Sequence, residues 1–188
     1  MASGDNDINI CSRALMAIGA NSITSFEEGT TEAQAANNKY ETAKKDLLAI
    51  YRWTFNQNET FAARLNSDSL AIYKYLYELP LDCLRVMSIK EDGISQPYTW
   101  RNGKINTDAE NPVITYCADV KEDIMPSYFV TVLIDRLARD LIIPVTGKHD
   151  EYRTFDAIYQ STLTTAKNID AQSKTASRIK FFPALGVR

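Results

Sequence analysis

The sequence predicts an α+β protein: mainly a bundle of about four helices, with a small antiparallel β unit inserted between the second and third helices and an extended C-terminal tail. Apolar residues recur every three or four positions in both terminal thirds, as on one face of a helix. Between them apolar residues alternate, as in strands. The predicted parts are a helical body (1–58 and 126–172), a β insertion (59–125) and a C-terminal tail (173–188).

Two helices are expected before the β unit. The first covers Asp5–Ile18, with Gly19 as its stop. The second and longer one covers Thr31–Phe55, where Thr31 and Gln34 fit a capping box. Its apolar stripe is Ala33, Ala36, Tyr40, Ala43, Leu47 and Ile50. Small residues in such a stripe favour close approach of helices, so we expect this helix to be the structural spine of the subunit.

The middle of the chain predicts four or so strands. The clearest is a hairpin over Tyr98–Asn106, because Asn102-Gly103 supplies the two positive φ angles of a type I′ turn and places Trp100 opposite Ile105. The other expected strands are Leu70–Leu79, Leu84–Lys90 and Pro112–Cys117.

Helical periodicity returns at about Ser127. Two adjacent apolar rows predict the most buried helix of the protein, which Pro144 ends. After a turn at Gly147, Asp150 is expected to cap a last helix, and from about Ala171 the periodicity ends. The inward residues of that last helix are predicted to be Tyr152, Phe155, Tyr159, Leu163, Ala166 and Ile169.

Composition bounds the class of protein. A chain of 188 residues is expected to form one domain, with room for a sub-domain. It has no apolar run of the roughly 20 residues that span a bilayer, and the N-terminal sequence lacks the pattern of a signal peptide. The three cysteines, Cys11, Cys83 and Cys117, are far apart and predict reduced thiols.

Charge is distributed unevenly along the chain. The net charge is −3, yet residues 171–188 carry four basic residues and no acidic one, so the remaining 170 residues sum to −7. An acidic body with a basic, partly apolar tail indicates that the tail docks on a partner. The alternatives are a disordered tail or a weak nucleic-acid contact through Phe181 and Phe182.

No residue pattern predicts catalysis, a cofactor or a metal. The only histidine is His149, and the sequence has no C-x-x-C pair. Cys83 lies in an apolar context that favours an inert thiol. The loop acids Glu27, Glu28 and Glu91 are more typical of solvated turns than of acid/base catalysis. The tyrosines of residues 73–77 and Trp100 could form a carbohydrate or base platform, but core or subunit packing is the favoured interpretation.

Four stretches carry a resemblance to a known family. They are residues 8–28 (INICSRALMAIGANSITSFEE), the long helix with its exit at residues 51–55 (YRWTF), residues 77–86 (YELPLDCLRV) and residues 129–147 (FVTVLIDRLARDLIIPVTG). Together they resemble the head-to-tail connector adaptors of short-tailed bacteriophages, the tail tubular protein A group, also called gatekeeper or head completion proteins.

The resemblance implies a structural virion protein of the phage neck, made in the host cytoplasm. It implies a ring, commonly dodecameric, that binds the portal protein and the tail nozzle and forms part of the DNA channel without specific DNA binding. It implies neither an enzyme nor a membrane contact. The alternatives are an entry-associated cell-wall hydrolase and a small nucleic-acid-binding module.

Three groups of residues are the expected contact sites. They are a portal-binding tail (Arg178, Lys180, Phe181, Phe182 and Leu185), a nozzle-facing part of the β unit (Tyr98, Trp100, Asn102 and Gly103) and a subunit-packing stripe (Ala36, Tyr40 and Ala43).

Overall fold

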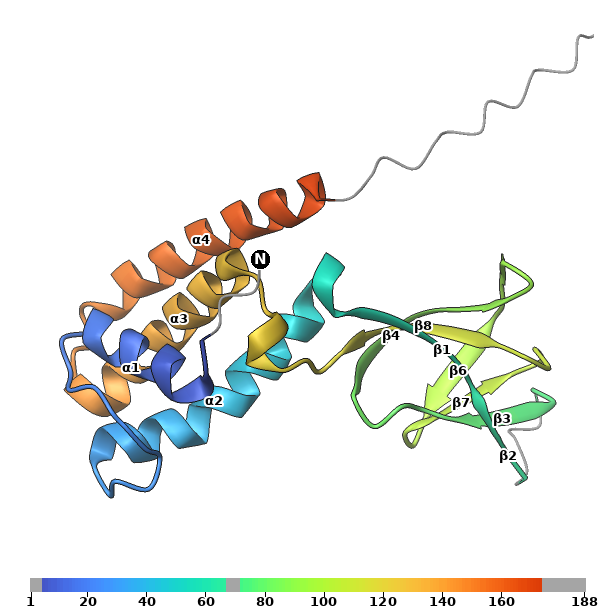
Figure 1. The fold of residues 1–188 in the computed structure, drawn as a ribbon, viewed down its shortest axis with the longest axis horizontal. Coiled ribbons are helices and arrows are strands. Elements are labelled where there is room, and N and C mark those ends of the chain that lie inside the picture. The colour runs from blue at the N-terminus through green and yellow to red at the C-terminus, as the bar shows by residue number, and fades with distance from the viewer. Residues whose placement is uncertain (1–4, 67–71, 174–188) are drawn as a thin grey trace, which may run out of the picture.

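The computed structural model describes residues 5–66 and 72–173. It shows an elongated molecule in which the helical body and the β unit lie one after the other along the long axis (Figure 1). Within these residues four α-helices form the body, and the β unit is inserted between the second and the third. The predicted α+β class and the insertion of the β unit after the second helix are confirmed, but over the described residues the β unit has eight strands in two sheets rather than the four or so expected, so the protein is not mainly a helical bundle.

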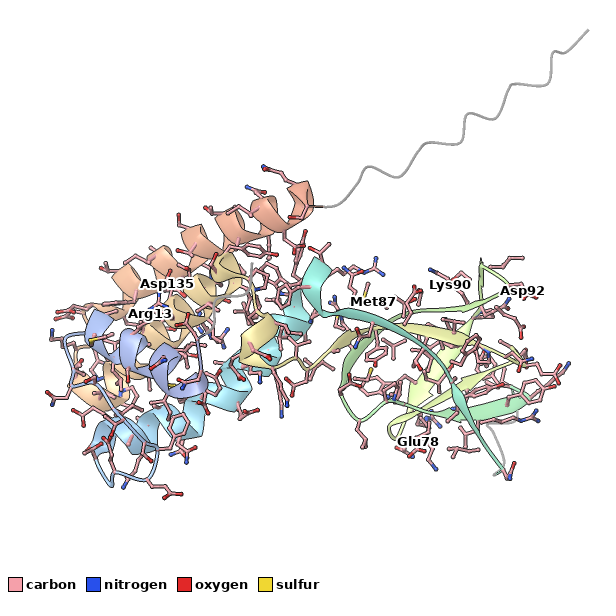
Figure 2. All side chains as sticks on the ribbon, in the orientation of Figure 1. Arg13, Glu78, Met87, Lys90, Asp92 and Asp135 are labelled. Atoms are coloured by element: carbon pink, nitrogen blue, oxygen red, sulfur yellow. The ribbon has the colours of Figure 1, made fainter. Side chains whose placement is uncertain are left out.

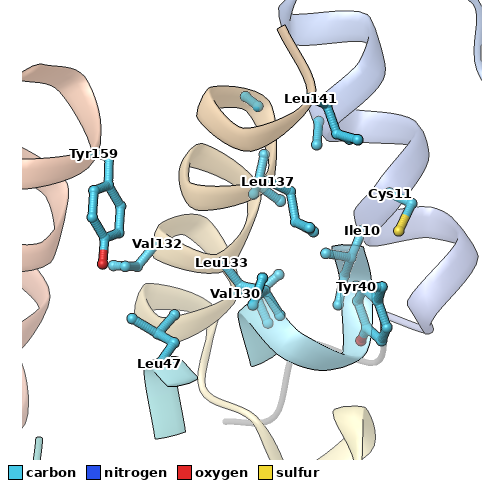
Figure 3. Packing of buried hydrophobic residues seen from close by; sticks show 14 of the residues in the cluster. Ile10, Cys11, Tyr40, Leu47, Val130, Val132, Leu133, Leu137, Leu141 and Tyr159 are labelled. Atoms are coloured by element: carbon cyan, nitrogen blue, oxygen red, sulfur yellow. The ribbon is translucent and has the colours of Figure 1, made fainter. Parts of the chain in front are cut away.

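The helical body is built around its third helix. The four helices are α1 (Asp7–Ala17), α2 (Thr31–Ile50), α3 (Ser127–Leu141) and α4 (Tyr152–Gln172). α3 contacts all the others, and its buried apolar residues lie between those of α1, α2 and α4 (Figure 3). The two apolar rows in its sequence therefore match a helix covered on several sides.

The ends of the helices differ from the predicted ones. α2 stops at Ile50 rather than Phe55, and its N-cap is Thr30, whose hydroxyl accepts the amide of Ala33. α4 starts after Glu151, which makes no side-chain cap, so the predicted cap at Asp150 is wrong. α3 continues directly into a π-helical turn, η3 (Ile142–Thr146), and the chain then reverses at Gly147 with φ of 69°.

The inward face of α4 was only partly predicted. Tyr159, Leu163 and Ala166 are buried as expected, but Tyr152 and Ile169 are 36% and 42% exposed. Asp170 is the fully buried residue of the last turn. Asp170 follows Leu163 and Ala166 at the helical spacing of three and four residues, so it lies on the same buried face. Helical periodicity therefore predicts its burial, although its charge would suggest an exposed position.

Two four-stranded antiparallel sheets make up the β unit. One sheet has the order β1-β8-β4-β5 and the other the order β2-β3-β7-β6. The strands are β1 (Gln57–Phe61), β2 (Ala63–Leu65), β3 (Tyr75–Glu78), β4 (Cys83–Glu91), β5 (Ile94–Ser95), β6 (Tyr98–Arg101), β7 (Lys104–Thr107) and β8 (Val113–Ala118). A second, smaller apolar core lies within this unit.

The predicted hairpin is confirmed. Asn102 and Gly103 have φ of 52° and 70°, and Trp100 pairs with Ile105 across β6 and β7. The expected strands at 84–90 and 112–117 correspond to β4 and β8, and that at 70–79 shortens to β3, although Leu70 lies outside the described residues. β1, β2 and β5 were missed, because their polar or very short segments lack an alternating apolar pattern.

Candidate interaction surfaces and the waist between them

The helical body and the β unit meet at a waist, which we define as residues 51–57 and 119–125. Trp53 is fully buried there, and its indole Nε1 donates a hydrogen bond to the Leu47 carbonyl at 2.8 Å. Its ring meets Tyr51 and Phe129 edge-on, at centroid separations of 4.9 and 5.2 Å. Edge-on aromatic contacts have a preferred geometry in addition to the apolar area that they bury. They therefore fix the direction in which the chain leaves α2.

A buried carboxylate fastens α4 to the waist. Asp170 accepts hydrogen bonds from the backbone amide of Thr54 at 2.9 Å, from the Thr54 hydroxyl, and from the Tyr128 hydroxyl at 2.8 Å. The end of α4 therefore lies next to the segment that joins α2 to β1 (Figure 1). Burial of the Tyr128 hydroxyl, together with its hydrogen bond to Asp170, raises the pKa of the phenol.

A second polar network lies between α2 and the turn η2 (Glu122–Ile124) that leads into α3. The Lys44 ammonium is 2.8 Å from a Glu122 carboxylate oxygen and 3.6 Å from Asp119, and the Tyr40 hydroxyl donates to the same Glu122 oxygen. The Lys44 side chain is only 8% exposed. A nearly buried ammonium needs such partners, because its desolvation is costly.

In this network hydrogen bonds and charge pairing together have a larger effect on the pKa values than burial has. Burial lowers the pKa of Lys44, but the hydrogen bond and charge of Glu122 outweigh burial and hold the pKa above its ordinary value. For Glu122 burial raises the pKa, and the bonds from Lys44 and Tyr40 lower it to a net value below the ordinary one. Both groups are therefore ionised at neutral pH.

Exposed apolar side chains concentrate on the β unit. Among the described residues, five large apolar side chains are at least 63% exposed, and all five lie between residues 59 and 125. They are Phe61 (77%), Ile72 (80%), Leu81 (105%), Ile94 (67%) and Trp100 (63%). Exposed apolar residues of the body reach only 56%, at Met16. Apolar side chains held in water mark contact surfaces, so the β unit is the better candidate for binding partners.

Two of these residues line one groove. Phe61 ends β1, and Leu81 lies in the loop between β3 and β4. The groove is lined by Thr60, Phe61, Ala63, Glu78, Leu79, Pro80 and Leu81. In Figure 2, Glu78 projects from one edge of the β unit, and Lys90 and Asp92 project from the opposite edge. Sequence analysis missed this groove, because Phe61 lies in the polar segment QNETF.

The predicted nozzle-facing residues all lie on the β6–β7 hairpin. Trp100 is 63% exposed, and the turn residues Asn102 and Gly103 are exposed as well. Tyr98 is half-buried and packs against the core of the β unit. The structure thus brings these four residues together on one projecting element.

The predicted subunit-packing residues lie on α2 as expected, but they are buried within their own chain. Ala36, Tyr40 and Ala43 are 0%, 3% and 2% exposed within their own chain. Their side chains pack in the core of the body, so they offer almost no surface to a neighbouring subunit. This burial does not support the predicted intersubunit contact. The residues predicted to bind the portal (Arg178, Lys180, Phe181, Phe182 and Leu185) lie outside the described residues.

Two of the acids considered for chemistry, Glu28 and Glu91, have structural partners. The Glu28 carboxylate accepts the hydroxyl and amide of Thr24 and the amide of Ser25, and the Thr24 hydroxyl above all lowers its pKa. The Glu91 carboxylate accepts the amides of residues 110 and 111. These bonds hold both carboxylates in place, and those made to Glu28 favour its ionised form, which a general acid would not.

Two of the three cysteines, Cys11 and Cys83, are held as thiols. Burial raises the pKa of Cys11 to about 12 and that of Cys83 to about 11, with a smaller contribution from a nearby aspartate in each case. Over residues 5–66 and 72–173, no cluster of three or more histidine, cysteine, aspartate or glutamate side chains is placed to hold a metal ion. Across the same residues, no helix combines the length and apolar character needed to cross a bilayer.

The helical body and the β unit are joined by a hydrogen-bonded waist, and the β unit exposes several large apolar side chains, which is typical of a protein that binds partners. The model of the tail tubular protein family matches residues 6–125, which is more than half of the chain. The chain therefore belongs to the tail tubular protein family, a family of structural, non-enzymatic components of the phage virion tail. No protein in a search of curated sequences matched the chain.

Proposed function

We propose that the chain is one subunit of a dodecameric ring adaptor that joins the portal to the tail nozzle and forms part of the DNA channel. The observation that carries this proposal is the family match, which covers α1, α2 and every described strand of the β unit. The division of the molecule supports it, since an adaptor has to contact one partner at each end.

In this proposal the β unit faces the nozzle. Its β6–β7 hairpin carries the exposed Trp100, and exposed tryptophan is enriched among the residues that dominate protein interfaces. The portal is contacted by the basic tail, through Phe181, Phe182 and Leu185 with the charges of Arg178 and Lys180. An acidic body suits a channel for DNA, because basic walls would retain the phosphates.

Contacts between subunits have to use exposed faces, because the small residues of α2 are buried. The outward face of α4 suits this role. None of its exposed residues between 157 and 173 is charged, and a groove on it is lined by Ala157, Ile158 and Ser161 among others. Depletion of charge is the compositional mark of interface cores. A head-to-tail contact of this kind closes into a ring when the rotation between copies allows it.

Electron microscopy of the purified chain mixed with portal tests the proposal. We expect a second ring stacked on the portal, and we expect the variant Phe181→Ser/Phe182→Ser to leave the portal bare while remaining folded. Val187→Ser, a change of another apolar residue in the same tail, is the matched control and should still dock. Bare portals in the presence of excess unmodified chain would contradict an adaptor role.

A further inference from the structure

The outer edge of β1 is a candidate binding site of the β unit. Within the residues that the structure describes, β1 pairs only with β8, which leaves its other edge without a strand partner. The exposed Phe61 ends this strand, and the apolar groove between Phe61 and Leu81 lies beside it. A strand edge next to an apolar groove is the arrangement that binds an extended peptide, since backbone hydrogen bonds and side-chain pockets then act together.

The C-terminal residues of the same chain have the matching chemistry. Residues 178–181 (RIKF) alternate basic and apolar, the pattern of a strand with one apolar face. Residues 174–188 carry four basic residues and no acidic one. Residues 59–125 contain eleven acidic residues against seven basic ones, a net charge of −4. The segment and the β unit therefore attract each other.

The path of the chain places this segment within reach. Asp170 fixes the end of α4 to Thr54, and β1 begins only three residues later, at Gln57. Those three residues span roughly 10 Å at most. Ile179 and Phe181 lie six and eight residues beyond Ser173, so an extended chain can carry them roughly 20 and 27 Å. Phe61 lies seven residues beyond Thr54, roughly 24 Å at most, so Phe181 can reach the groove and Ile179 can reach the part of β1 that leads to it.

We propose that residues 174–188 bind in cis along the free edge of β1, with Ile179 against the strand and Phe181 in the groove between Phe61 and Leu81. The bound segment covers the open edge and two of the most exposed apolar side chains of the molecule. Natural proteins protect exposed strand edges in this way against edge-to-edge association. One consequence rests on the proposed function: the portal and β1 compete for the same apolar residues, so docking on the portal uncovers the groove.

Amide hydrogen exchange of the full-length chain, without portal, tests the inference. Alternate amides of β1 point away from β8 and exchange quickly unless another strand covers them. We expect these amides to exchange roughly tenfold or more slowly in the unmodified chain than in Ile179→Ser/Phe181→Ser, with β8 amides unchanged in both. Phe61→Ser/Leu81→Ser should also speed exchange in β1. The matched controls Val187→Ser and Ile94→Ser should leave it unchanged.

Two results would overturn the inference. One is fast exchange of the outward β1 amides in the unmodified chain, equal to that in the Ile179→Ser/Phe181→Ser variant. The other is protection that grows with chain concentration and survives in that variant, which would assign the edge to a second copy. Neither result bears on docking to the portal, so a failure here is distinguishable from a failure of the adaptor proposal.

Discussion

The helical body and the β unit differ in how far they bury their large apolar side chains. The body buries most of its large apolar residues around α3, in one cluster that draws on all four helices. The β unit has a much smaller core, and five large apolar residues are at least 63% exposed there. Because burial of apolar area is the main source of folding free energy, the body supplies stability and the β unit supplies contact surface.

At the waist, hydrogen bonds and an ion pair connect the helical body to the β unit. Asp170 on one side and the Lys44–Glu122 pair on the other connect α4 and α2 to the segments that enter and leave the β unit. Asn56 adds a link, since its amide donates to the carbonyls of Leu48 and Ala118. The two parts are thus fixed by directional bonds, which set orientation better than apolar packing alone.

The largest expected effect is in the core of the body. Phe129→Ala removes a fully buried ring that contacts Trp53 and Phe55, and we expect it to lower the free energy of unfolding by about 4 kcal/mol. Denaturant unfolding followed by circular dichroism measures this change. A loss below about 1 kcal/mol would mean that the body is not the main source of stability.

The next effect is at the waist and depends on pH. Glu122→Gln leaves Lys44 nearly buried without its closest anion, so we expect a loss of about 3 kcal/mol at pH 7. The pKa of Glu122 lies below its ordinary value of 4.5, so its stabilisation is complete above pH 4.5 and is lost as pH falls through the lowered pKa. On the alkaline side the raised pKa of Lys44 keeps the pair intact to above 10.5.

Unfolding measured across the pH range tests whether the stability contributed by Glu122 is lost in acid, as expected. The stability difference between the unmodified chain and Glu122→Gln should be largest from about pH 5 to 10 and should shrink on acidification. A difference that grows in acid would contradict the assigned ion pair. The double variant Lys44→Met/Glu122→Leu should recover much of the loss, because it removes both charges together.

A smaller effect is expected at the buried carboxylate. Asp170→Ala should cost about 2 kcal/mol, since it leaves the Thr54 amide and the Tyr128 hydroxyl without this acceptor. The matched control is Asp156→Ala on the same helix, where a 40% exposed carboxylate pairs with Arg139 and about 0.5 kcal/mol is expected. Thermal unfolding of both variants measures the two losses of stability. Equal losses would contradict a special structural role of the Asp170 carboxylate.

The smallest stability effect is expected on the β unit. Leu81→Ser and Trp100→Ser replace side chains that are 105% and 63% exposed, so each should change the free energy of unfolding by about 0.5 kcal/mol or less. Nozzle binding, measured by co-sedimentation with portal-bound chain, should nevertheless weaken with Trp100→Ser. If Trp100→Ser destabilises the fold and leaves nozzle binding intact, the division between the two parts is wrong.

Sequence periodicity predicted the body far better than the β unit. The apolar rows of residues 127–141 and the stripe of α2 define helix faces directly, and the Asn-Gly turn defines the hairpin. β1 escaped notice because an edge strand exposed on both faces needs no apolar alternation. Asp170, Lys44 and Glu122 could not be predicted as partners, because their contacts join residues 78 or more positions apart in the chain.

One measurement tests the central claim most directly: a high-resolution electron microscopy map of the chain assembled with portal and nozzle. The account predicts a ring in which the hairpin of residues 98–107 meets the nozzle and Trp100 loses its solvent exposure, while Ala36 and Ala43 stay inside their own subunit. A map in which the nozzle contacts the helical body and Trp100 remains in solvent would contradict it.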